Sequence, residues 1–487
     1  MNNNNSYRNV LKATSLFAGV QGLNILLNLF RAKLAAVILG PEGIGLNAIF
    51  NETRELIHES TNIGLDKSGV REIARAYDGE IGNQEKQEAV DDAIALTRSW
   101  VLLLASAGTL ITIILAKPLS LFTFSSTDYT WGYVLLSPAV GFSTMTCGEL
   151  VVLRGIHRLK KIASVSLLHV LCGVVTTIPI YYLWGMRGVV PALDLMTFSM
   201  MVVTMAISYR IQPPRFCFQK DYLGRGKRML TIGLSFVVAS FIAHGSRLII
   251  QAYLNNQASL SEVGLYNAGY TLAMVYTAML FASLDTDYFP RLSAVFNYQQ
   301  KRLRTIQKQI DVTLTIIFPV IIGMVFSMPI IVPLFLSNEF VGIIPMAQVI
   351  SLSLLFRAMY LPMAILPLSA GDSHIYLMMQ LISYLGIIPF VLFGYDQGGL
   401  LGAGMGWFAA NLYDMLCSLL LARLKYHVYP SRASFFCLLL YIIAVIAAYV
   451  LATETSGINY CTVGITFCAL TTLYAYFTIR KKWSANE

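Results

Sequence analysis

Five basic residues interrupt stretches of the sequence that are otherwise apolar. They are Arg31, Lys33, Arg54, Arg247 and Arg357. A charged side chain is costly in hydrocarbon unless it faces a cavity or a partner. Arginine keeps its charge at any accessible pH, and its planar guanidinium donates paired hydrogen bonds that match a phosphate group. The set therefore predicts an anion-binding site, with snorkelling of Arg31 and Lys33 toward lipid headgroups as an open alternative.

Charged residues crowd one face of the segment 43–64. At about 100° per residue of an α-helix, an arc of about 160° holds all of them, and apolar residues occupy the other side. They are Glu52, Arg54, Glu55, His58 and Glu59. Two interpretations stay open. The charged face lines a cavity, or it forms a self-satisfied network in which Glu55 pairs with Arg54 and His58.

Single carboxylates in other apolar stretches are candidates for ion coupling. A carboxylate in an apolar environment can take up a proton or a cation, as coupled transporters require. Glu149 and Asp414 are therefore candidates for coupling to H+ or Na+, together with the carboxylates of segment 43–64. Asp285 and Asp287 stand close to Arg291 in the sequence, and we expect them to pair with it.

The sequence lacks the motifs of catalysis. It contains no Ser-His-Asp constellation, no Walker motif and no cluster of metal ligands. The glycine-rich run 398–406 follows no strand and precedes no Lys-Ser or Lys-Thr pair, so it predicts close helix packing. We therefore expect no cofactor and no enzymatic activity.

The elements that position these residues must have lipid as their solvent. Of the 487 residues, 56% are hydrophobic and 13% are charged, whereas a water-soluble surface needs roughly a quarter charged residues. Apolar runs recur at the length of about 20 residues that crosses hydrocarbon as a helix. The sequence predicts an all-α polytopic membrane protein with about fourteen spans. These lie near 10–38, 43–64, 98–116, 130–153, 162–183, 188–209, 229–254, 262–288, 310–336, 343–368, 375–394, 399–424, 433–452 and 459–479.

The two halves of the chain show a weak internal repeat. A shift of 219 positions places Leu11, Phe17, Gly45 and Leu46 on Leu230, Phe236, Gly264 and Leu265. Transporter folds are often duplicated, and six spans in each half return the chain to the same side. We therefore expect two pseudo-symmetric six-helix bundles, 1–209 and 229–425, joined by a cytoplasmic linker at 210–228. Two additional helices follow in 426–487.

The net charge of +9 is explained by membrane orientation. With the N-terminus inside, 27 of the 35 Lys and Arg residues fall in cytoplasmic segments, as the positive-inside rule predicts. Both termini are then cytoplasmic, and no nucleic-acid partner is expected. Of the other eight basic residues, Arg98, Lys117 and Arg187 are assigned to helix ends, which leaves the five named first.

Two motifs resemble those of a known family. Residues 33–48 read KLAAVILGPEGIGLNA, which resembles the KLLAxxxGPxGxGLxA signature of Wzx-type lipid-linked oligosaccharide flippases. Their superfamily also holds multidrug exporters and the lipid II flippase. Residues 289–293, FPRLS, are similar to the motif that ends the eighth helix of the family. The carboxylates of segment 43–64 and the last two spans depart from the family pattern.

The resemblance implies a function. It implies two six-helix bundles around a central cavity that opens alternately to each side of a bacterial inner membrane. The implied cargo is undecaprenyl diphosphate carrying an oligosaccharide repeat unit, for O-antigen or another surface polysaccharide. The resemblance also implies membrane lipids as further partners, and a polysaccharide polymerase or glycosyltransferases as neighbours of this protein in the same biosynthesis. A cation-coupled multidrug exporter and a membrane-embedded glycan polymerase or ligase are the alternatives.

Overall fold

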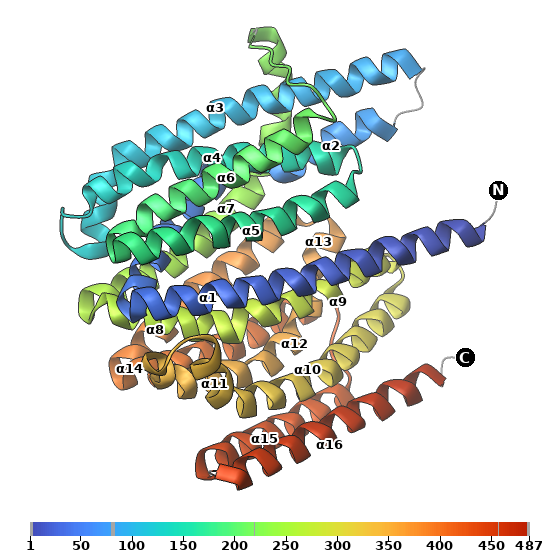
Figure 1. Ribbon diagram of the computed structural model, residues 1–487. Coiled ribbons are helices and arrows are strands. Elements are labelled where there is room, and N and C mark those ends of the chain that lie inside the picture. Colours follow the sequence, from blue (N-terminus) through green and yellow to red (C-terminus); the bar gives the residue numbers. More distant parts are fainter. Residues whose placement is uncertain (1–2, 79–82, 219, 456, 485–487) are drawn as a thin grey trace. The chain divides into compact units, whose positions relative to one another are not determined.

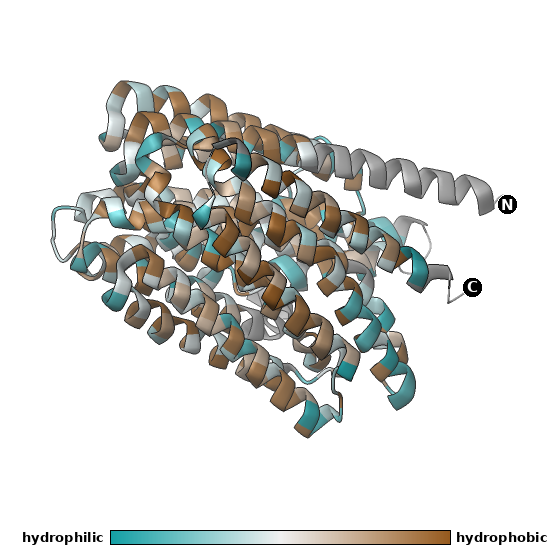
Figure 2. Cartoon of the chain, turned by 90° about the horizontal axis from the view of Figure 1, so that it is seen from below, coloured by the Kyte–Doolittle hydropathy of each residue, from teal (hydrophilic) through white to brown (hydrophobic). Residues whose placement is uncertain are grey.

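The computed structural model describes residues 3–78, 83–218, 220–455 and 457–484. Every regular element within these ranges is a helix. Nine of the helices are long and apolar enough to cross a membrane, or up to ten if one bent pair is counted as a single span. Figure 2 shows apolar residues along most of their length. The chain is therefore a multi-pass α-helical membrane protein, as the sequence predicts.

Several of the long helices join two apolar segments at a break. The helix α1 (Asn3–Thr61) is interrupted at Gly40, whose φ of 63° lies in the left-handed region that favours glycine. The helix α14 (Ser373–Tyr426) is interrupted at Gly398–Gly399. Its two ends lie close together: the hydroxyl of Tyr426 donates a hydrogen bond at 2.8 Å to Oδ2 of Asp372, the residue that precedes α14. Such joined segments are counted once among the nine helices, so the number of fourteen spans stays a prediction.

Packing divides the chain into two units at Gly264. Unit 1 holds α1, α2 (Leu65–Asp78), α3 (Asn83–Phe124), α4 (Thr130–Gly155), α5 (Leu159–Trp184), η1 (Gly185–Gly188), α6 (Val189–Tyr209), α7 (Lys220–Gln257) and the start of α8 (Leu260–Tyr270). Within it α4 packs between α3 and α6, and α1 packs on α5 and α7 (Figure 1). The start of α8 crosses α1 where Gly264 meets Gly45.

Unit 2 is built around the helix α10. It holds the end of α8, η2 (Thr271–Val275), α9 (Tyr276–Val295), α10 (Gln299–Phe335), η3 (Asn338–Ile343), α11 (Ile344–Leu352), α12 (Leu354–Ala364), α13 (Leu366–Ala370), α14, α15 (Arg432–Glu454) and α16 (Gly457–Ser484). The two C-terminal helices pack on α10, where the rings of Phe318 and Tyr441 stack at 4.3 Å and Tyr460 donates to the carbonyl of Phe326 at 2.7 Å. The last two helices thus belong to unit 2 and pack on the surface of α10.

This division differs from the predicted domain boundary. Residues 229–264 were assigned to the second bundle, but α7 packs against α1, α2 and α3 and belongs to unit 1 by its contacts. The two pseudo-symmetric six-helix bundles, which describe a repeat in the chain rather than a packing unit, stay a prediction.

The helix α2 is an element that the sequence reasoning treated as part of a loop. Ile73 is buried against residues of α3 and α4, in a cluster with Val90, Ile94, Val151 and Val152. Its exposed side carries Arg71 and Arg75. An amphipathic helix of this kind lies well at a membrane surface.

Candidate functional site

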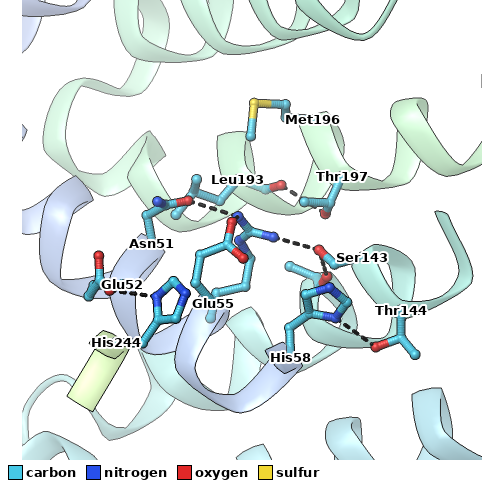
Figure 3. A network of polar contacts seen from close by, with 12 residues as sticks. Asn51, Glu52, Glu55, His58, Ser143, Thr144, Leu193, Met196, Thr197 and His244 are labelled. Carbon is cyan, nitrogen blue, oxygen red and sulfur yellow. Dashed lines mark hydrogen bonds and ion pairs between the residues drawn. The ribbon is translucent and has the colours of Figure 1, made fainter. Parts of the chain in front are cut away.

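Arg54 belongs to a polar network in unit 1, and Figure 3 shows its partners Asn51, Glu55 and Ser143. The side chain of Arg54 is 9% exposed, and it donates to Ser143 Oγ of α4 at 2.6 Å and to Asn51 Oδ1 at 3.0 Å. It also forms an ion pair with its neighbour Glu55. One turn farther along α1, the imidazole Nδ1 of His58 lies 3.0 Å from Thr144 Oγ1. Both Nη atoms of Arg54 and the imidazole of His58 thus have partners, whereas Arg54 Nε is buried without one, so both interpretations of the charged face stay open.

Glu52 brings α1 and α7 together. Its Oε1 accepts from Arg247 Nε at 2.9 Å and lies 2.7 Å from Nδ1 of His244. The same Nδ1 lies 2.8 Å from Arg247 Nη2. A protonated Nδ1 donates to Glu52, whereas an unprotonated Nδ1 accepts from Arg247, so the proton on His244 selects its partner. Arg247, which the sequence predicts as an anion ligand, is held by a carboxylate in this structure.

Three other predicted residues of α1 lie apart from this network or at its edge. Arg31 points toward α6, where its Nη1 lies 3.2 Å from the sulfur of Met196, and toward Gly173 of α5. Lys33 is half-buried on the same helix. Glu59 is also half-buried and lies within electrostatic range of His244 and Lys67.

Arg98 and Glu149 form a buried ion pair that corrects the assignment of Arg98 to a helix end. Arg98 is 2% exposed, and its Nε and Nη2 donate to the two oxygens of Glu149 at 2.9 and 2.8 Å. Its Nη1 also donates to the carbonyl of Pro213 at 2.8 Å, and Ser208 Oγ donates to Glu149 Oε2 at 2.6 Å. The reason is that α3 begins at Asn83, so Arg98 lies well inside the helix. Glu149 has a structural role here, and its part in ion coupling stays a prediction.

Arg357 is the candidate cation of unit 2. Its Nη1 lies 3.6 Å from the sulfur of Met274, and its guanidinium lies 5.2 Å from the ring centroid of Phe281. Its Nε is buried without a hydrogen-bond partner. Among the residues that the structure describes, no carboxylate forms an ion pair with it, although Asp285 and Asp414 lie within electrostatic range. Its donors are therefore the most open of the predicted set.

Asp414 lies beside a small cavity in unit 2. Asp414 is 6% exposed, and its Oδ2 accepts from Ser383 Oγ at 2.7 Å. The cavity has a volume of about 60 Å³ and is also lined by Tyr360, Gln380 and Ser418. It is large enough for a water molecule, which needs about 10–15 Å³ of such volume. Asp285 lies within electrostatic range of Arg357. The side chain of Asp287 lies outside the described residues. The pairing of these two carboxylates with Arg291 therefore stays a prediction.

The fold is shared with known transporters. It matches a lipid II flippase, MurJ, in an inward closed conformation with a TM-score of 0.69 and 15% identity, over 96% of this chain and 99% of that chain. It also matches a multidrug resistance MATE transporter of the MOP superfamily in an inward-facing conformation, with a TM-score of 0.67 and 15% identity, over 83% and 94% of the two chains. The chain therefore shares its fold with these two proteins.

The family can be stated more closely. The model of the polysaccharide biosynthesis protein family matches residues 85–345, more than half of the chain, and the chain belongs to this family. It is similar to the lipid III flippases of Escherichia coli K12 and Shigella flexneri, each 23% identical over 328 residues, which cover 63% of this chain and 73% of theirs. The resemblance to lipid-linked oligosaccharide flippases is thus confirmed. These relatives are flippases and transporters, in agreement with the expectation of a non-enzyme.

Proposed function

We propose that this protein moves undecaprenyl-diphosphate-linked oligosaccharide repeat units across a bacterial inner membrane. The cargo passes from the cytoplasmic to the periplasmic leaflet by alternating access, and it serves O-antigen or another surface polysaccharide. Membership of the polysaccharide biosynthesis family and the similarity to lipid III flippases support this proposal. Both termini then lie in the cytoplasm, where most of the basic residues are expected.

The observation that carries the proposal is the open guanidinium of Arg357. A diphosphate cannot leave water without donors and positive charge to replace its hydration. A thioether sulfur and an aromatic face are weak partners that a phosphate oxygen can displace, and the Nε of Arg357 has no partner to lose. Arg54 and Arg247 already hold carboxylates. We therefore assign the first diphosphate contact to Arg357 of unit 2. Within unit 1, Arg31, Lys33, Arg54 and Arg247 are proposed separately as cationic ligands.

In this proposal, Asp414 binds the ion that drives transport. Its carboxylate opens on a cavity with room for a water molecule or a single ion without its hydration shell, and it lies within electrostatic range of Arg357. Uptake of H+ or Na+ at Asp414 changes the net charge beside the guanidinium. Binding of the ion and binding of the diphosphate are then coupled energetically.

Loss of the arginine tests the proposal. In a strain whose own copy of this gene is deleted, the wild-type protein is expected to restore surface polysaccharide, and Arg357→Gln is expected to leave lipid-linked oligosaccharide on the cytoplasmic leaflet. Arg187→Gln, at an exposed position of unit 1, is the matched control. Normal surface polysaccharide from Arg357→Gln at equal expression would contradict the assignment of Arg357.

A cation-coupled multidrug exporter is the second candidate. The fold shared with a MATE transporter favours it, as do the carboxylates Asp285 and Asp414 of unit 2, which suit a cationic drug. It predicts efflux of small organic cations that Asp414→Asn abolishes. Unchanged drug resistance in the deletion strain, together with loss of surface polysaccharide, would decide for the flippase.

A further inference from the structure

Three aromatic side chains of unit 2 form one fixed group. The indole Nε1 of Trp407 donates to the hydroxyl of Tyr266 at 2.9 Å, and these two residues are 7% and 3% exposed. The ring of Tyr270 lies 6.3 Å from that of Tyr266, nearly parallel at 12°, and 5.0 Å from that of Trp407. Tyr270 is half-exposed. Two buried rings whose polar atoms satisfy each other therefore hold a third ring in place with part of its surface free.

The backbone next to Tyr270 connects this group to Arg357. Tyr270 ends α8, and the π-helical turn Thr271–Val275 follows it directly. Such turns are rare and are frequent at functional sites, because they change the direction of side chains within a helix. Met274, the residue of this turn whose sulfur meets Arg357, is buried. One turn of chain thus positions both the aromatic group and the contact of the guanidinium.

Tyr360 closes the arrangement from α12. It lies within electrostatic range of Arg357, Asp414, Tyr384 and Tyr270. Neither Tyr270 nor Tyr360 makes a hydrogen bond through its hydroxyl among the described residues. Buried or half-buried hydroxyls are normally hydrogen-bonded, and a helix surface in lipid is a poor place for an unsatisfied one. These two hydroxyls are therefore available to a polar ligand beside Arg357.

We propose that Tyr270 is the stacking platform for the sugar that is joined to the diphosphate, and that Tyr360 donates a hydrogen bond to its rim. A pyranose has an apolar C–H face and a rim of hydroxyls. An aromatic ring can cover the first while phenol hydroxyls and a guanidinium bind the second and the diphosphate. Arg357 recognises the phosphate that every cargo of this class carries, and Tyr270 recognises that a sugar is attached. This inference rests on the proposed function and deepens it.

Binding to the purified full-length protein in nanodiscs tests the platform. The probes are undecaprenyl diphosphate and undecaprenyl diphosphate carrying one N-acetylhexosamine, and the measurement is the dissociation constant of each. The wild type is expected to bind the sugar-bearing lipid more tightly. Tyr270→Ala is expected to lose about 10-fold in affinity for that lipid, and none for the bare diphosphate. Tyr270→Phe keeps the ring and should stay within about 3-fold of the wild type.

Three controls separate stacking from other effects. Tyr360→Phe should weaken only the sugar-bearing lipid, and Arg357→Gln should weaken both lipids. Tyr182→Ala, on an exposed side chain of α5, should change neither. Thermal unfolding of Tyr270→Ala shows whether the variant is folded. If it is not, Tyr360→Phe and the comparison of the two lipids with the wild type still test the proposal.

The outcomes are distinct. Equal loss of both lipids in Tyr270→Ala would overturn the platform and leave a residue that only supports Arg357. Equal binding of both lipids by the wild type would also overturn it while the proposed function stands. Binding of neither lipid, with binding of an aromatic cation such as ethidium in their place, would overturn the proposed function itself.

Discussion

Gly45 and Gly264 meet at a point where neither residue can carry a side chain. A Cβ on Gly45 would collide with the carbonyl oxygen of Leu260, and a Cβ on Gly264 would collide with the carbonyl oxygen of Pro41. In each case the backbone nitrogen of the opposite glycine also lies 2.9 Å from the added atom. The helices α1 and α8 therefore cross backbone against backbone.

The internal repeat maps this contact onto itself. A shift of 219 positions carries Gly45 onto Gly264 and Pro41 onto Leu260, which exchanges the two halves of the contact. The four identities that suggest the repeat are weak alone. A reciprocal contact at the same offset is what a local pseudo-twofold axis would produce at this crossing, and the two pseudo-symmetric bundles stay a prediction.

The symmetry predicts equal effects of two distant substitutions. Gly45→Ala and Gly264→Ala should each destabilise the protein by about 1–3 kcal/mol or more, because each adds a Cβ to an overpacked contact. Gly22→Ala and Gly245→Ala are controls, since their added Cβ meets nothing closer than 4.0 Å. Thermal unfolding of the purified variants measures the effect. Tolerance of one substitution and not the other would contradict the reciprocal contact.

The Arg98–Glu149 pair should be essential to unit 1. Glu149→Gln leaves a buried guanidinium without its charge partner, which typically costs about 3–5 kcal/mol. The pair Arg215–Asp91, whose arginine side chain is 65% exposed, is the control, and Asp91→Asn should cost at most about 1 kcal/mol. The yield and thermal stability of the folded protein report both. Equal stability of the two variants would show that the buried pair does not support the fold.

Glu52 should compete with the cargo for Arg247. Because Glu52 accepts from Arg247 Nε at 2.9 Å, Glu52→Gln should release the guanidinium and raise the affinity for undecaprenyl diphosphate, by about 10-fold if one charge-assisted bond is gained. Glu42→Gln, at an exposed position of the same helix, is the control. Direct binding measurements decide, and a lower affinity in Glu52→Gln would indicate that the carboxylate positions Arg247 for the ligand.

Asp372 should contribute stability over a wide pH range. A hydrogen bond from Tyr426, followed by the nearby ammonium of Lys425, lowers the pKa of this exposed carboxyl from its usual value. A lowered folded-state pKa means a contribution that is present above the unfolded pKa of about 3.9 and is lost as the pH falls through the folded value. Asp372→Asn should therefore lower the thermal stability equally at pH 6 and pH 8. If the difference in thermal stability between the wild type and Asp372→Asn changed between pH 6 and pH 8, the assignment would be contradicted.

Much of the fold follows from composition and periodicity, and the site follows only in part. Arg357 and the charged face of α1 could be found from the sequence, because a charge within an apolar run is conspicuous. Arg98 was misplaced because hydropathy locates the apolar part of a helix and not its true start, which lies at Asn83. Its partner Glu149 is 51 residues away, and such a pairing depends on how α3 and α4 pack.

No feature of the sequence indicates the aromatic group around Tyr270. Tyrosine and tryptophan are common in membrane helices, and neither spacing nor charge distinguishes Tyr266, Tyr270 and Trp407 from the other aromatic residues. Only the hydrogen bond from Trp407 to Tyr266 and the π-helical turn beside Tyr270 do so. The break in α14, in contrast, could be predicted, because Gly398 and Gly399 lie where the predicted spans 375–394 and 399–424 meet.

Translocation by the purified protein tests the central claim most directly. The full-length protein is reconstituted into liposomes that hold a labelled undecaprenyl-diphosphate-linked oligosaccharide, and the fraction of the sugar accessible from outside is followed over time. The account predicts movement between leaflets with the wild type and with Arg187→Gln, and little above the protein-free rate with Arg357→Gln. Movement of the lipid-linked oligosaccharide at the wild-type rate with Arg357→Gln would contradict the account. So would wild-type liposomes that transport a cationic dye and do not move the lipid-linked oligosaccharide.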